Sequence, residues 1–182
     1  MNHLTWSRPH LRTWRAFDRL YSVCLPQNSR ADRSYLIREY YPHTHLAWKG
    51  DSLVGFFVAW KSATPDTVWL ESIGVAPSER GTGLSSAILE EAEKLALQMG
   101  GARVELAVDG YNQIAIQFYR RHGYKGVARP GEKLTFAKSI AATLAPTSKT
   151  QDIDEANAPW LHTSRSPVAR ALRLTFYRAV TL

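Results

Sequence analysis

The 182-residue sequence contains a single cysteine, Cys24. One cysteine cannot form an intramolecular disulfide, which excludes a fold that depends on a disulfide framework. The six histidines are scattered along the chain, and no histidine has zinc-ligand spacing with the cysteine. We therefore expect no metal site and a protein of a reducing compartment.

Long apolar runs are also missing. No stretch of 18 apolar residues occurs, so no transmembrane helix is expected. The first nine residues lack the apolar segment of a signal peptide. We expect a cytoplasmic protein with no membrane partner. With 45% apolar residues, the chain can bury one good core, or one core and an appendage.

Acidic residues are outnumbered, because 16 Asp and Glu stand against 23 Lys and Arg. The excess is concentrated in residues 1–50, where eight basic and three acidic residues give a net charge of +5. Arg12, Arg15 and Arg19 recur at helical spacing, which is typical of a solvated helix face. The same charge also fits an anionic partner, such as a nucleic acid, at this half of the protein.

Apolar periodicity and turn residues predict an alternation of strands and helices. Pro26 and Pro42 end two early helices, and Gly50-Asp51-Ser52 forms a hairpin turn. The expected strands are 2–8, 45–49, 53–61, 67–75, 103–108, 124–128 and 133–140, and the expected helices are 11–25, 28–41, 84–99 and 113–122. The order βααβββαβαββ predicts a mixed sheet with helices on its faces.

The most informative segment is Arg80-Gly81-Thr82-Gly83-Leu84-Ser85, which joins an expected strand to an expected helix. The first turn of a helix leaves amide groups unpaired and favours negative charge. Glycines let the backbone approach a phosphate, so this order predicts a pyrophosphate site. The segment lacks the Lys-Ser/Thr pair of a Walker loop and the third glycine of a dinucleotide fingerprint.

Two signatures resemble those of the GNAT superfamily of acyl-CoA N-acyltransferases. Arg80-x-x-Gly83-x-Ser85 resembles the phosphate-binding signature, with Ser85 where Gly or Ala is usual. The second is Asn112-x-x-Ala115-x-x-Phe118-Tyr119-x-x-x-Gly123-Tyr124. The resemblance covers roughly residues 1–140 and implies a GNAT fold, an α/β (α+β) class with a mixed, mostly antiparallel sheet of about seven strands and about four helices.

The resemblance implies acetyl-CoA as the acyl donor. In this family the loop backbone holds the diphosphate, and the preceding strand pairs with the pantetheine amides before it diverges from the next strand. The expected cofactor-binding residues are Ile73, Gly74, Val75, Arg80, Gly81, Thr82, Gly83, Leu84, Ser85, Ser86 and Asn112. Asn112 also fits the N-cap of the helix that follows it.

Tyr119 occupies the position of the family's general acid. A phenol with a pKa of about 10 is well matched to protonate a thiolate with a pKa of about 8.5. The alternative role is a core aromatic residue beside Phe118.

Glu71 is the leading candidate for the general base. Period two places it on the same strand face as Ile73 and Val75, where a carboxylate is costly to bury without a partner. Glu105 on the neighbouring strand is the second candidate. Both carboxylates also fit a structural role, each paired with a nearby arginine.

The ends of the chain and the acceptor are less defined. We expect a GNAT N-acetyltransferase domain over residues 1–144 and a linker with a C-terminal extension over 145–182, whose apolar part beyond Pro159 suits packing on the core or in a homodimer. In this family the two early helices cover the acceptor. Arg30, Arg33 and Arg38 are therefore candidates to bind a substrate carboxylate, or are solvent-facing charges.

The favoured function is acetylation of a primary amine on a small or amino-acid-like molecule. Two alternatives remain open. The basic N-terminal half suits a macromolecular acceptor, such as a protein N-terminus or an aminoacyl-tRNA. Ser85 and the undecided base suit a domain that binds acyl-CoA without catalysis.

Overall fold

The computed structural model describes residues 4–25, 33–127 and 133–141. Its elements are β1 (Leu4–Ser7), α1 (Trp14–Cys24), α2 (Arg33–Tyr35), β2 (Thr44–Lys49), β3 (Ser52–Lys61), β4 (Thr67–Val75), α3 (Leu84–Gln98), β5 (Arg103–Asp109), α4 (Gln113–Arg121), β6 (Lys125–Val127) and β7 (Lys133–Ser139). This order confirms the predicted βααβββαβαββ arrangement. The expected linker and extension at 145–182, and Arg30, lie outside the described residues.

One mixed sheet organises the fold. The strands lie in the order β1-β2-β3-β4-β5-β7-β6, and every neighbouring pair is antiparallel except β4 and β5, which are parallel. The predicted mixed, mostly antiparallel sheet is therefore confirmed.

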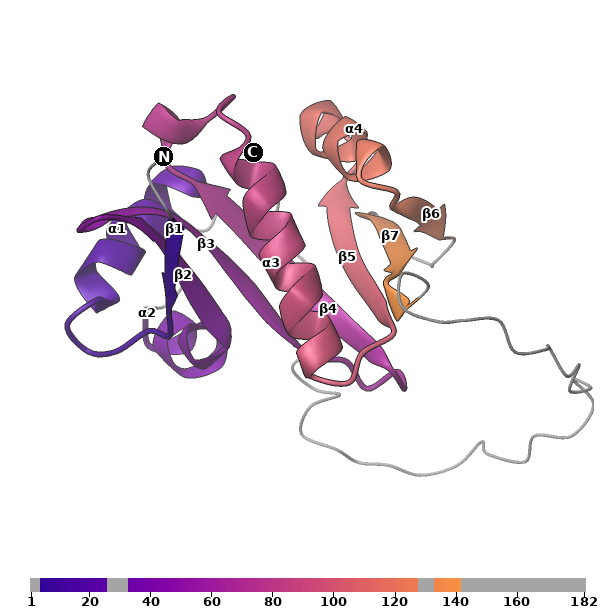
Figure 1. Cartoon of the computed structure of the whole chain (residues 1–182), viewed down its shortest axis with the longest axis horizontal. Coiled ribbons are helices and arrows are strands. Elements are labelled where there is room, and N and C mark those ends of the chain that lie inside the picture. The colour runs from indigo at the N-terminus through magenta and orange to yellow at the C-terminus, as the bar shows by residue number, and fades with distance from the viewer. Residues whose placement is uncertain (1–3, 26–32, 128–132, 142–182) are drawn as a thin grey trace, which may run out of the picture.

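Helices cover both faces of the sheet (Figure 1). On one face, α3 and α4 contribute Leu84, Ile88, Phe118 and Tyr119 to a large apolar cluster. On the other face, α1 and the segment after α2 form a second cluster that is rich in aromatic residues. None of the described helices has the length and apolar composition needed to cross a bilayer.

In its described part, the second predicted helix is not one continuous α-helix. Instead of a continuous α-helix, α2 passes into a π-helical turn over Leu36–Tyr40 and a 3-10 turn over Tyr41–His43. Pro42 has no amide hydrogen with which to continue the α-helical ladder. The Tyr41 amide donates to the Leu36 carbonyl, five residues back, and this wide turn directs Tyr40 toward the sheet.

Gly74 on β4 is required by an aromatic ring on β3. A Cβ at this position would lie 2.2 Å from Cε1 of Phe56. The Phe56 ring is itself held by Phe17 and Tyr21 of α1, with ring centroids 5.2 and 5.7 Å away. The close approach of β4 to this ring therefore excludes any side chain larger than hydrogen.

We predict that Gly74→Ala destabilises the protein by about 1–3 kcal/mol, because overpacking a confined ring forces neighbouring groups to shift. Urea unfolding would measure the change. Gly126→Ala is the matched control, since a Cβ at Gly126 meets nothing within 4 Å. An unfolding midpoint for Gly74→Ala equal to that of the control would show that the Phe56 ring is free to move.

Candidate active site

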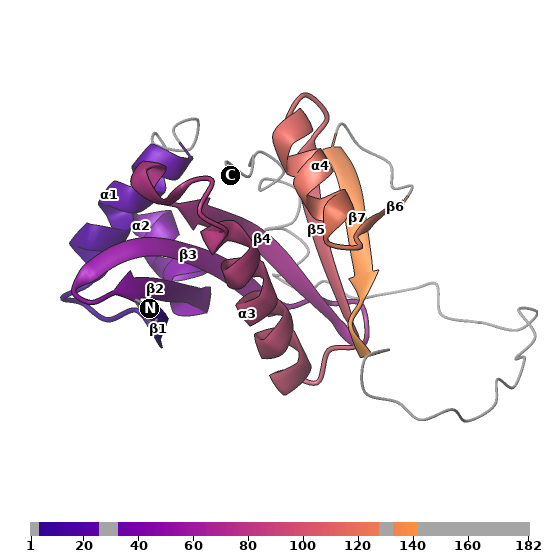
Figure 2. The same cartoon turned by 45° about the horizontal axis from the view of Figure 1, so that its top comes forward.

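The sheet divides between β4 and β5. These strands pair only at Thr67–Arg103, Val68–Val104 and Trp69–Glu105. Beyond Trp69, β4 continues along β3, and beyond Glu105, β5 continues along β7. The two strands diverge toward the N-terminal end of α3 (Figures 1 and 2). No described strand pairs with this edge of β4 past Trp69. Apart from the Val75 carbonyl, which accepts from the Cys24 thiol, the edge is open to an extended ligand.

A β-bulge falls on β4 at the point of divergence. Leu70 lies opposite Ala59 and Ser72 opposite Val58, so Glu71 is inserted between two registered pairs. A bulge shifts the alternation of side chains by one residue. Leu70 and Ile73 accordingly join the same apolar cluster on the α3 side.

The bulge overturns the predicted position of Glu71. Period two predicts Glu71 on the face of Ile73 and Val75, but its carboxylate points to the opposite face, toward the π-helical turn after α2. There the Tyr40 hydroxyl donates to Oε1 at 3.1 Å and the Trp69 indole donates to Oε2 at 2.8 Å. Both donors fix the orientation of the half-buried carboxylate.

The sequence does not predict a contact between Tyr40 and Glu71. The apolar helical spacing of Tyr40 marks it as a core residue, and it is indeed buried. Its hydroxyl donates to Glu71 on the same face of the sheet. That contact depends on the π-helical turn, which no sequence motif indicates.

Glu105, the second candidate base, is held in place by an ion pair. Its side chain is 2% exposed, and Arg103 Nε donates to it at 2.9 Å. The Arg103 side chain is 42% exposed, so the pair is only partly buried, but a buried carboxylate is costly unless it is partnered. The geometry therefore favours a structural role for Glu105.

The conformation of residues 80–85, the glycine loop, depends on its two glycines. Gly81 and Gly83 have φ angles of +76° and +87°, in the left-handed region that favours glycine. The Thr82 hydroxyl donates to the Glu79 carbonyl at 2.7 Å, and Lys49 forms an ion pair with Glu79. A Cβ at either glycine would meet no atom within 4 Å, so open space lies over the loop.

The amides of this loop are suited to an anion. Within the described ranges, the backbone N–H groups of residues 81–85 donate to no backbone acceptor, whereas Ser86 N–H donates to the Gly83 carbonyl. Gly83 is the N-cap of α3 and provides no side-chain cap. Unpaired amides at the N-terminus of a 15-residue helix form a site for phosphate.

Arg80 lies at the junction of the loop, β4 and α1. Burial raises the pKa of the Cys24 thiol to about 11, against the opposing effects of the Arg80 charge and a hydrogen bond to Val75. The protonated thiol donates to the Val75 carbonyl at 3.3 Å. Cys24 thereby ties α1 to the end of β4, directly before the loop.

Asn112 begins α4. Its Oδ1 accepts from the Ala115 amide at 3.1 Å, so its role as N-cap is confirmed. Two turns later, Tyr119 is fully buried in the same cluster as Ile73, Val75 and Leu84.

The Tyr119 hydroxyl has no hydrogen-bond partner in the described part of the chain. A buried hydroxyl without a partner is unusual and costly. Burial raises the pKa of the Tyr119 phenol above its ordinary value, so the match to a thiolate pKa assumed from the sequence does not hold in this state. The phenol keeps its proton and is a ready hydrogen-bond donor.

The predicted residues thus form two groups. Those on the α3 side are Ile73 and Val75, the loop from Arg80 to Ser86, and Tyr119. Glu71 lies on the opposite face of β4, beside Tyr40 and Trp69. Within the described ranges, no group of three or more His, Cys, Asp or Glu side chains is placed to hold a metal ion.

Residues 11–124 match the family model described as the acetyltransferase (GNAT) family. The chain is 33% identical over 90 residues to a streptothricin acetyltransferase of Streptomyces lavendulae, which is 44% of this chain and 48% of that protein. It is 31% identical over 78 residues to a thialysine N-epsilon-acetyltransferase of Sus scrofa, which is 41% of this chain and 46% of that protein. The chain therefore spans about half the length of these relatives.

Among solved structures, the PaiA N-acetyltransferase of Thermoplasma acidophilum in complex with coenzyme A superposes with a TM-score of 0.60 at 17% identity. The superposition covers 75% of this chain and 99% of that chain. At this identity the likeness concerns the fold.

Proposed function

Since the chain belongs to the acetyltransferase (GNAT) family, we propose that it transfers the acetyl group of acetyl-CoA to a primary amine of a small molecule by direct attack in a ternary complex. The observation that carries the proposal is the continuity of one element. β4 runs from the point of divergence at Trp69 to Val75, and a short 3-10 turn over Pro77–Glu79 leads from there to the glycine loop, whose backbone N–H groups donate to no backbone acceptor. An extended thioester with a diphosphate at one end matches both features.

The loop and β4 hold the donor in this proposal. Backbone amides from Gly81 to Ser85 bind the diphosphate, and Arg80 adds positive charge beside them. The free edge of β4 around Ile73 to Val75 pairs with the pantetheine amides, as an added strand would. This arrangement places the thioester in the divergence of β4 and β5, where the sheet provides no competing hydrogen bonds.

Glu71 acts as the general base for the acceptor amine, on the face of β4 opposite α3. A lysine-like amine is neutral in only about one of 10³ molecules at pH 7, so attack requires removal of a proton. Glu71 is partly exposed and its carboxylate is held by Tyr40 and Trp69. It accepts a proton from the ammonium, directly or through water, and the lone pair that this frees on nitrogen then attacks the thioester carbon.

Tyr119 assists departure of the thiolate. When the carbon–sulfur bond breaks, charge develops on sulfur, and the Tyr119 O–H donates a hydrogen bond to it and then its proton. The pKa of the Tyr119 phenol, raised by burial, makes complete proton transfer unfavourable before charge has built up on sulfur. Stabilisation of the thiolate by the hydrogen bond is therefore the first contribution of Tyr119, and the proton follows as product forms.

Small amines are the favoured acceptors because two curated relatives carry names with small-molecule acceptors, streptothricin and thialysine. A macromolecular acceptor is the second candidate. Arg12, Arg15 and Arg19 are all exposed near or along α1, on the layer that covers the Glu71 face. These charges suit an anionic surface such as RNA.

The first prediction concerns the loop. The wild-type chain binds acetyl-CoA and releases free CoA with at least one member of a panel of amines, amino acids and peptides, while Gly83→Val abolishes binding because its side chain fills the phosphate position. Calorimetry measures binding. Gly83→Asn, which tolerates the left-handed conformation, separates loss of space from backbone strain, and Gly126→Val is the neutral control.

Wild-type protein that takes up no acetyl-CoA would refute the proposal. CoA binding without turnover of any amine would favour the non-catalytic alternative. A steep loss of acceptor binding between about 50 and 200 mM salt would favour a nucleic-acid acceptor, because phosphate contacts release counterions.

The second prediction concerns Tyr119. Tyr119→Phe lowers kcat by about 10²-fold, within the usual range for general acid assistance, and leaves the Kd for acetyl-CoA nearly unchanged. Steady-state kinetics and calorimetry measure the two quantities. Tyr111→Phe, at a site that is 79% exposed, is the control. A kcat equal to that of the control would remove Tyr119 from the reaction.

The third prediction concerns Glu71. Glu71→Gln lowers kcat at neutral pH by about 10²-fold, and its rate keeps rising with pH until the free amine deprotonates, since the carboxylate no longer takes the proton. A pH–rate profile measures this shift. Glu91→Gln on the surface of α3 is the control. Identical profiles for Glu71→Gln and wild type would exclude Glu71 as the base.

A further inference from the structure

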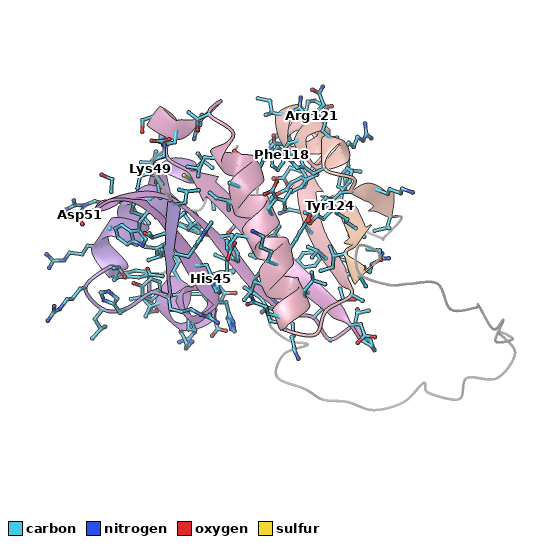
Figure 3. All side chains as sticks on the ribbon, in the orientation of Figure 1. His45, Lys49, Asp51, Phe118, Arg121 and Tyr124 are labelled. Atoms are coloured by element: carbon cyan, nitrogen blue, oxygen red, sulfur yellow. The ribbon has the colours of Figure 1, made fainter. Side chains whose placement is uncertain are left out.

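His122 connects two helices that belong to different halves of the divided sheet. It is the C-cap of α4. Its Nδ1 lies 2.8 Å from the Phe118 carbonyl, and its Nε2 lies 2.9 Å from the Ser86 hydroxyl at the start of α3. The imidazole also packs on the Phe118 ring, with centroids 4.3 Å apart. Figure 3 shows Phe118 between α3 and α4.

The hydrogen-bond roles follow from the partners. A carbonyl only accepts, so Nδ1 carries the hydrogen that it donates to Phe118. In the neutral imidazole, Nε2 then accepts from the Ser86 O–H. Both ring nitrogens are thus used, and the ring is fixed in one orientation between the helices.

The contact between Ser86 and His122 joins the two halves of the sheet at the end where β4 and β5 are apart. β4 and β5 are joined over three residue pairs at one end of the divergence, whereas Ser86 lies at the other end, in the first turn of α3. An ion pair from Lys138 on β7 to Glu93 on α3, at 2.8 Å, crosses between the halves farther along α3. Ser86–His122 is the crossing contact that adjoins the glycine loop.

His122 also lies three residues after Tyr119, on the helix that carries the proposed acid. Ser86 lies three residues after Gly83, on the helix that begins at the proposed diphosphate site. The contact therefore fixes the separation between the two points that bind opposite ends of the donor. Because the pantetheine arm has a limited length, this separation affects whether sulfur meets the Tyr119 hydroxyl.

We propose that His122 is a positioning residue, which acts through Ser86 to hold the diphosphate-binding end of α3 and the Tyr119-bearing helix α4 at the spacing that the donor requires. The inference rests on the proposed function. His122 itself touches neither the donor nor the acceptor.

The test uses two substitutions, each of which keeps a hydrogen-bonding group near only one of the two imidazole nitrogens. His122→Asn keeps a donor near the position of Nδ1, for the Phe118 carbonyl, but does not reach Ser86. His122→Gln extends its amide toward the position of Nε2 and reaches Ser86. We expect His122→Asn to raise the Kd for acetyl-CoA by about three- to tenfold, as loss of one hydrogen bond implies, and His122→Gln to restore most of the affinity.

Two combinations separate positioning from general damage. Adding His122→Asn to Ser86→Ala weakens binding no further than Ser86→Ala alone, because both changes break one contact. His122→Asn lowers kcat in the wild-type background but not in the Tyr119→Phe background, because the alignment that it disturbs matters only when the phenol is present. A merely structural defect would lower kcat equally in both backgrounds.

Gln117→Ala, on the exposed face of α4, is the control and leaves Kd and kcat unchanged. The inference is overturned if His122→Asn binds and turns over like wild type, or if its effect adds fully to that of Ser86→Ala or persists in Tyr119→Phe. If His122→Asn fails to fold, His122→Gln and Ser86→Ala decide, since His122→Gln must then retain the affinity that Ser86→Ala loses. Absence of acetyl-CoA binding by the wild-type chain would instead refute the proposed function, and this inference with it.

Discussion

The limited pairing of β4 with β5 is the constraint on which the rest of the structure depends. Two parallel strands that stay paired leave no backbone edge for a ligand. Here they separate beyond Trp69 and Glu105, while each remains paired on its outer side, interrupted only by the bulge at Glu71 within the described strands. The sheet therefore keeps its stability from the outer pairs and opens an edge in its middle. The loop after β4 then places the N-terminus of α3 at the end of that edge.

Much of this arrangement could be predicted because it is locally encoded. Gly81 and Gly83 lie between a strand and a helix, as the sequence predicts, and their Cβ-free backbone leaves the loop open. Asn112 caps α4 through its own side chain. Such features depend on a few neighbouring residues. The order of strands and helices follows from periodicity and turn residues, which are also local signals.

The face of Glu71 could not be predicted, because the bulge that sets it arises from pairing with β3 and leaves no mark on the β4 sequence. The same limit applies to Tyr40, whose hydroxyl reaches Glu71 through a π-helical turn. The contact between His122 and Ser86 joins residues 36 positions apart. In each case the contact of the side chain is set by tertiary packing, and the local preference of the sequence for helix or strand does not determine it.

Cys24 gives this fold a practical property. Its side chain is 0% exposed, its S–H is engaged by the Val75 carbonyl, and burial raises its pKa to about 11. Thiolate is the form that attacks disulfide dyes and alkylating agents. Cys24 of the folded protein should therefore react very slowly with such reagents. As the sequence holds no second cysteine, a colorimetric sulfhydryl signal from the folded chain would come from its reaction product, and a slow signal without substrate would report unfolding.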